Sequence, residues 1–140
     1  MDIKAFLRSY RPALIAAQKA ANKLDAARET GIKSPRIDGM PRSGGGNGLD
    51  DQLARIDALE RRLHKERERA LAIAEIIQDM IESLEDVNQR NVLRMRYLEG
   101  LTWVKIGMEL NYAERTLYTI HGQALTNLRR QKWELESGKK

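Results

Sequence analysis

The side chains best suited to chemistry lie near the C-terminal end of the chain, at the spacing of one helix face. Four of them follow a tight polar break: Glu114, Arg115, Tyr118 and Thr119. Arginine can donate two hydrogen bonds to guanine, and glutamate can accept one from cytosine. Tyrosine and threonine can contact bases, thymine methyl groups or phosphate. We interpret these four residues as base-facing side chains of a DNA-recognition helix.

A second set of polar residues flanks the first and is suited to contacts with phosphate. It consists of Thr102, Lys105, Arg129 and Arg130. Such contacts add affinity that depends on salt, and they carry no sequence information themselves. We expect these residues to lie nearer the DNA backbone than the base-facing set.

Two short amphipathic helices with a tight break between them must position these side chains. Thr102 stands where an N-cap belongs, and Trp103, Ile106 and Leu110 follow at helical spacing. Residues 111–112 make the turn, and a recognition helix is predicted over 113–132. Its predicted inner face is Leu117, Ile120, Ala124, Leu125 and Leu128. This order is typical of a helix-turn-helix, in which the second helix enters the major groove.

Three glycines fit this arrangement. A preceding helix is predicted to end at Glu99 and Gly100, where glycine allows a left-handed exit. Gly107 is expected where the two motif helices cross closely, because a side chain there would hold them apart. Gly122, on the outer face, would permit close approach of a ligand.

The composition favours a polyanionic partner and excludes thiol chemistry. The chain has 140 residues, and its 25 lysines and arginines exceed its 20 aspartates and glutamates, giving a net charge of +5. The absence of cysteine excludes disulfides, cysteine-ligated zinc and a thiol nucleophile. No signal peptide and no apolar run long enough to span a bilayer are visible. We expect a cytoplasmic protein with no membrane partner.

The pattern predicts an all-α fold with a long helical arm and a C-terminal three-helix domain. The predicted segments are an amphipathic helix over 1–30, a flexible Gly/Pro linker over 31–48, a coiled-coil-like helix over 49–83, the helix-turn-helix domain over 84–135 and a disordered tail over 136–140. Pro12 either kinks the first helix or marks the first turn of a second one. An intramolecular hairpin and an intermolecular coiled coil would bury the arm's apolar faces equally well.

Other chemistry finds little support in the sequence. His64 and His121 are the only histidines, and neither has further ligands at metal spacing. His64 is interpreted as a solvated helix-surface residue, and His121 as a helix-surface or phosphate-facing side chain and not a catalytic base. We find no acid/base pair and no nucleophile arrangement, and therefore expect no enzyme activity, no cofactor and no metal. Trp103 is expected in the core because it is periodic with Ile106 and Leu110.

The segment from Val92 to Leu128 resembles region 4 of bacterial sigma factors, the helix-turn-helix that reads the promoter −35 element. Together with residues 7–10, the Asp-Gly-Met-Pro segment at 38–41 and the long middle helix, the whole chain resembles small phage-encoded regulators related to the ArpU and RinA families of late-gene activators. The resemblance implies base or phosphate contacts from Glu114, Arg115, Tyr118 and Thr119. The chain departs from the pattern at Ala113, where a capping serine is common, and at Val104, where an acidic residue is usual.

Two functions from different classes follow from these observations. The first is a sequence-specific transcription regulator of double-stranded DNA in a bacterial host, with an arm that forms a homodimer or contacts RNA polymerase. The alternative is a phage DNA-packaging or architectural protein whose arm drives assembly. A third interpretation is a helical scaffold whose partner is another protein. It predicts that substituting Arg115 and Thr119 by alanine has no effect beyond small changes in stability.

Overall fold

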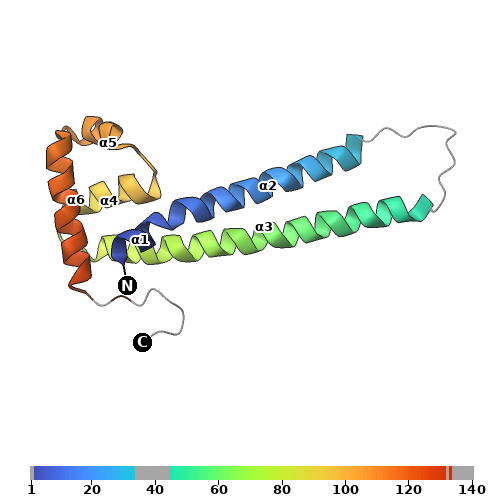
Figure 1. Cartoon of the computed structure of the whole chain (residues 1–140), viewed down its shortest axis with the longest axis horizontal. Coiled ribbons are helices and arrows are strands. Elements are labelled where there is room, and N and C mark those ends of the chain that lie inside the picture. The colour runs from blue at the N-terminus through green and yellow to red at the C-terminus, as the bar shows by residue number, and fades with distance from the viewer. Residues whose placement is uncertain (1, 34–44, 132, 134–140) are drawn as a thin grey trace. The chain divides into compact units, whose positions relative to one another are not determined.

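A computed structural model of the chain is all-α over the residues that it describes, which are 2–33, 45–131 and 133 (Figure 1). In chain order the elements are α1 (Ile3–Arg8), α2 (Tyr10–Lys33), α3 (Gly45–Glu82), α4 (Val87–Leu93), the π-helical turn η1 (Arg94–Leu98), α5 (Trp103–Leu110) and α6 (Glu114–Arg129). The predicted fold class, a long helical arm followed by a C-terminal helical cluster, is confirmed.

Local side-chain chemistry sets several of the helix ends. Asp2 and Asp86 cap α1 and α4, each accepting hydrogen bonds from two backbone N–H groups of the first turn. A break at Ser9 separates α1 from α2, and Pro12 lies in the first turn of α2, where its missing N–H leaves no partner unsatisfied. The interpretation of Pro12 as part of a first helical turn is therefore confirmed.

The glycine-rich linker is shorter than predicted. The sequence predicted a linker over 31–48, but α2 continues to Lys33 and α3 already begins at Gly45. Each glycine disfavours a helix by about 1 kcal/mol relative to alanine. Extending an existing helix is much easier than starting one, so two long helices continue into these flanks. Residues 34–44 and the predicted tail over 136–140 lie outside the described residues.

One compact unit of the chain, residues 13–69, is an antiparallel helical pair. Ala20, Leu24 and Leu63 are buried between α2 and α3, and the Gln52 side chain donates a hydrogen bond to the Ala27 carbonyl at 3.1 Å. Arg28 forms an ion pair with Glu60 across the same contact. Within this unit, the apolar stripes of the arm are therefore buried against each other in an intramolecular hairpin.

The second compact unit combines residues 1–12 with the chain from Ala70 onward. Its larger core brings α1 and the end of α3 onto α6. The buried members are Ile3, Leu7, Ile77, Met80, Ile81, Leu84, Leu93, Tyr97, Ala124, Leu125 and Leu128. A smaller core of Val92, Ile106 and Leu117 joins α4, α5 and α6. This packing divides the chain differently from the predicted segments, because the first helix and the end of the long helix belong with the C-terminal helices.

Candidate nucleic-acid interface

The angle between α5 and α6 is fixed by a tight turn. Thr102 caps α5, its Oγ1 accepting a hydrogen bond from the Lys105 N–H at 3.2 Å. Asn111 ends the helix in the left-handed conformation with φ of 62°, and the Tyr112 N–H donates to the Gly107 carbonyl at 3.1 Å. The predicted cap and the predicted turn are both confirmed. The helix-turn-helix order of the sequence is thus present as two helices held by one shared core.

Gly107 is required by this turn. A Cβ atom built there would lie 2.7 Å from the Tyr112 carbonyl oxygen and 3.5 Å from a Leu117 methyl group. The predicted steric role of Gly107 is confirmed, with the turn carbonyl as the closest neighbour. Gly122 has no such steric constraint within the protein, since a Cβ atom there would meet nothing within 4 Å.

The four predicted base-facing residues are all exposed on α6. Its buried face is formed by Leu117, Ala124, Leu125 and Leu128, while Ile120 is partly buried, as predicted. Glu114 and Arg115 belong to the first turn, and no ion pair among the described residues involves either of them. Thr119 Oγ1 donates a hydrogen bond to the Arg115 carbonyl at 3.2 Å, which leaves its oxygen free to accept from a base amino group.

The four predicted phosphate-contacting residues are also exposed. Thr102 and Lys105 lie at the start of α5, and Arg129 and Arg130 lie at the end of α6. The recognition helix is shorter than predicted: it spans Glu114–Arg129 and not 113–132, with Ala113 as an N-cap that makes no side-chain hydrogen bond. The lack of a capping hydroxyl costs about 1 kcal/mol of helix stability.

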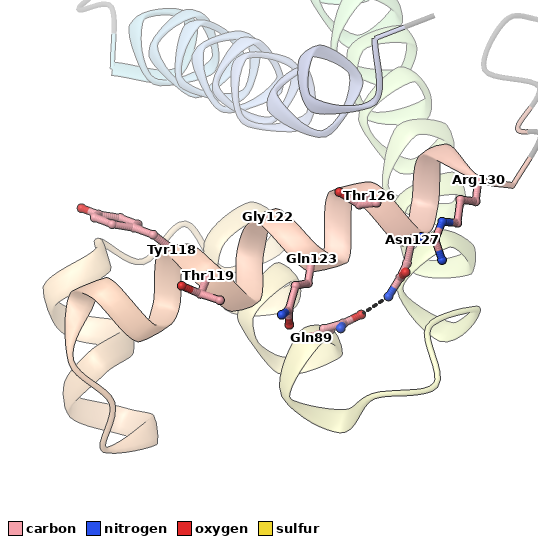
Figure 2. A pocket seen from close by; sticks show the side chains of 8 residues that line it. All are labelled: Gln89, Tyr118, Thr119, Gly122, Gln123, Thr126, Asn127 and Arg130. Atoms are coloured by element: carbon pink, nitrogen blue, oxygen red, sulfur yellow. Dashed lines mark hydrogen bonds between the residues drawn. The ribbon is translucent and has the colours of Figure 1, made fainter.

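A shallow groove follows the exposed face of α6 (Figure 2). It is lined by Gln89, Tyr118, Thr119, Gly122, Gln123, Thr126, Asn127 and Arg130. Asn127 donates a hydrogen bond to the Gln89 side chain at 2.9 Å, which ties α6 to α4 at one edge of the groove. Most of these side chains are uncharged donors and acceptors, the groups that read base edges.

Sequence reasoning missed several of these groove residues. Gln123 and Thr126 follow Thr119 by four and seven residues, which is the spacing of one helix face, so the helical period could have identified them. Gln89 could not have been found this way, because it comes from α4 and its place depends on tertiary packing. The groove brings Tyr118, Thr119 and Arg130 together, whereas Glu114 and Arg115 are not among its lining residues.

His121 was predicted on the helix surface, and the structure shows that this was wrong. It is only 8% exposed, its Nε2 lies 2.7 Å from the Tyr97 hydroxyl in a hydrogen bond, and its ring contacts Trp103 edge-on at 5.1 Å between centroids. The reason is its position one turn after Leu117, on the buried side of α6. His64 does lie on the surface as predicted, beside Glu68.

Trp103 lies at the centre of this aromatic cluster. It is partly buried against the smaller core, as predicted, and the Tyr118 ring meets it edge-on at 5.2 Å between centroids. The Arg96 guanidinium carbon lies 4.6 Å from the Trp103 ring centroid, in a cation–π contact. Tyr118 is 50% exposed, so part of its side chain is accessible to a ligand while its ring contacts Trp103.

Burial and surrounding cations both disfavour a charged His121. Burial contributes most to lowering its pKa from 6.5 to about 4, followed by the positive charges of Lys4, Arg96, Arg8 and Arg129. Burial likewise raises the pKa of Tyr97, opposed by Arg8 and Arg96. Both partners of the Tyr97–His121 hydrogen bond are therefore neutral at pH 7.

The lowered pKa of His121 predicts a loss of stability in acid. Between pH 6.5 and about 4 the unfolded chain binds a proton at this residue and the folded chain does not. The free energy of unfolding should therefore fall by about 3 kcal/mol as the pH drops through this window. Urea denaturation of the wild type and of His121→Gln across the window would measure the difference. His64→Gln, which removes the exposed histidine, is the matched control. An identical pH dependence in His121→Gln and wild type would contradict the prediction.

Within the parts of the chain that the structure describes, no three acidic or histidine side chains are grouped to hold a metal ion. No helix among the same residues has the length and apolarity needed to cross a membrane. The exposed faces of α5 and α6 carry hydrogen-bonding and positively charged side chains.

Residues 32–129 match a family described as "Protein of unknown function (DUF1492)", a range of more than two thirds of the chain. The chain belongs to the DUF1492 family. No curated protein and no solved structure matches it significantly. The range shared with DUF1492 includes the turn between α5 and α6 and the exposed face of α6 up to Arg129. It does not include α1, whose basic residues lie beside His121.

Proposed function

We propose that this DUF1492 protein is a sequence-specific DNA-binding transcription regulator of a phage or prophage, with α6 as the recognition helix. The observation that carries the proposal is the outer face of α6. It presents Arg115, Thr119, Gln123 and Thr126 on a helix whose opposite face is fixed in two cores. A rigid helix with exposed donors and acceptors at its N-terminal half is what major-groove reading requires.

The charge distribution around α6 supports a nucleic-acid partner. Lys105 is exposed in the first turn of α5, Arg129 and Arg130 are exposed at the C-terminal end of α6, and none of them takes part in an ion pair among the described residues. Unpaired cations flanking a polar reading face provide the sequence-independent part of the affinity. The resemblance to sigma-factor region 4 and to phage late-gene activators is the reason for assigning the DNA target to transcription control.

The exposed end of the helical hairpin supports a second candidate function, which depends on what this end contacts. Leu49 and Leu53, one helical turn apart near the start of α3, are 63% and 56% exposed, whereas Ile56 is partly buried and Leu63 is buried against α2. We propose this end of the arm as the contact for a homodimer or for RNA polymerase. If the contact instead builds a larger ring, the protein is a DNA-packaging or architectural component.

The test is selection from a randomised duplex library with the purified full-length protein over a series of salt concentrations. A regulator should enrich a defined motif, with affinity that falls steeply as salt rises. Salt-sensitive binding without enrichment would favour the packaging or architectural alternative. The absence of binding at every salt concentration would refute DNA recognition. Light scattering of the same sample then separates a monomer or dimer from a ring of many subunits.

A further inference from the structure

A basic pocket lies beside α6 and was not anticipated from the sequence. Its cationic side chains come from three elements: Lys4 and Arg8 from α1, Arg11 from the first turn of α2, and Arg96 from η1. Tyr118 and His121 of α6 also line it. We call this site the basic pocket. All of these residues belong to the same compact unit.

Among the described residues, no carboxylate forms an ion pair with the cations of the basic pocket. None of the ion pairs among the described residues involves Lys4, Arg8, Arg11 or Arg96. The nearby Asp2 carboxylate is engaged with the backbone, where one oxygen accepts from the Lys4 and Ala5 N–H groups at 3.1 and 3.3 Å. Four like charges that line one pocket repel one another, and no described carboxylate offsets them, so an anion bound there would relieve the repulsion.

One guanidinium group, that of Arg96, is held in place by other contacts, and a second, that of Arg11, lies close to the backbone at Gly100. Arg96 donates a hydrogen bond to the Leu101 carbonyl at 3.1 Å and lies over the Trp103 ring. Arg11 lies against Gly100, where a Cβ atom would come within 2.8 Å of the guanidinium carbon. A positioned guanidinium loses little entropy on binding and matches the geometry of a phosphate group. The pocket is therefore suited to phosphate more than to a diffuse counter-ion.

The basic pocket adjoins the proposed reading face of α6. Tyr118 lines both the pocket and the groove of Figure 2. Arg129 follows Tyr118 by eleven residues, which places the two within about 20° of each other around the helix axis. A duplex seated on α6 would have one sugar-phosphate backbone passing along this side of the helix.

We propose that the basic pocket binds a phosphate group of the DNA backbone, with Lys4, Arg8, Arg11 and Arg96 as its ligands. This inference rests on the proposed function and extends the interface to α1 and η1, beyond the two helices of the recognition motif. A phosphate held there fixes the register of α6 in the groove without reading sequence. The negative charge of the phosphate also offsets the positive potential at His121. The ring resonances of His121 therefore report whether the basic pocket is occupied.

The first measurement uses DNA and a charge-matched control. Lys4→Ala/Arg8→Ala removes two pocket cations, and Arg62→Ala/Lys65→Ala removes two exposed cations from the hairpin. With full-length protein and duplexes of random and selected sequence, the pocket variant should make the slope of log affinity against log salt shallower by about 1 relative to wild type, because one phosphate contact is lost. Its ranking of duplexes should not change, and the control should match wild type. Circular dichroism of each variant confirms folding, and Arg8→Gln provides a milder substitution.

The second measurement does not depend on DNA. Inorganic phosphate, added at constant ionic strength in place of chloride, should shift the His121 ring resonances in wild type and not in the pocket variant. If wild type binds DNA and the pocket variant keeps the salt slope of the control, the backbone assignment is overturned. If phosphate shifts His121 while DNA does not bind, the proposed function fails and the pocket serves a small phosphorylated molecule. If phosphate leaves His121 unchanged, the pocket is not a phosphate site.

Discussion

Replacing Arg115 with alanine is expected to weaken binding to the preferred duplex by about 5- to 150-fold, which corresponds to about 1–3 kcal/mol. Arg115 is exposed in the first turn of α6, and no ion pair among the described residues competes for its guanidinium. It is therefore available to donate two hydrogen bonds to a guanine edge. Because the loss is specific to the base that it contacts, affinity for unrelated duplexes should change far less.

Competition binding with the selected duplex and its single-base-pair substitutions measures this effect. One base-pair position should become degenerate in Arg115→Ala, and adding Thr119→Ala should remove the preference at a neighbouring position. Arg130→Ala is the contrasting variant, expected to weaken all duplexes alike and to reduce the salt slope by about 1. Arg62→Ala on α3 controls for the loss of one positive charge. If Arg115→Ala weakens every duplex to the same extent, Arg115 contacts the backbone and α6 does not read bases through it.

The elements around the proposed interface could be predicted because their ends depend on local chemistry. The Thr102 cap, the left-handed Asn111 and the positive φ of 74° at Gly100 each follow from a residue type and its immediate neighbours. The π-helical turn η1 could not be predicted in this way. Its defining hydrogen bond runs from the Glu99 N–H to the carbonyl of Arg94, five residues earlier, and no residue type in the segment indicates it. It widens the helix just before Gly100 and places Arg96 over Trp103.

His121 was assigned to the helix surface because it is polar, although its position in the helical period places it on the buried face. Its spacing from Leu117 and Leu125 places it on the buried face, but a histidine among polar residues reads as exposed. What stabilises it inside is the hydrogen bond to Tyr97, a residue 24 positions earlier in the chain. Neither the partner nor its distance can be deduced from the local pattern, so the correct interpretation required the tertiary contact.

The basic pocket could not be predicted from the sequence, because its residues come together only through tertiary packing. Lys4, Arg8 and Arg11 look like solvated charges on an amphipathic helix, and Arg96 lies far along the chain. Only the packing of Ile3 and Leu7 into the core of α3 and α6 brings them beside His121. Amphipathic spacing shows which face of α1 is buried, but many apolar faces in this chain could receive it.

Two glycine substitutions separate the fold of the recognition motif from its contact with a ligand. Gly107→Val is expected to destabilise the C-terminal helices by about 1–3 kcal/mol or more, because the new Cβ would lie 2.7 Å from the Tyr112 carbonyl oxygen. That atom is backbone in a tight turn and cannot rotate away. Relief would require the turn to open, which moves α6 relative to α5.

Gly122→Ala is the matched control, with the opposite expected sign. A Cβ atom at Gly122 meets nothing within 4 Å, and alanine is favoured over glycine in a helix interior by about 0.5–1 kcal/mol. Urea denaturation should therefore show higher stability for Gly122→Ala and lower stability for Gly107→Val. If DNA lies as close to α6 as proposed, Gly122→Ala binds its duplex more weakly despite the more stable fold. Equal or tighter binding by Gly122→Ala would place the DNA away from this part of the helix, and a Gly107→Val protein as stable as wild type would contradict the turn geometry.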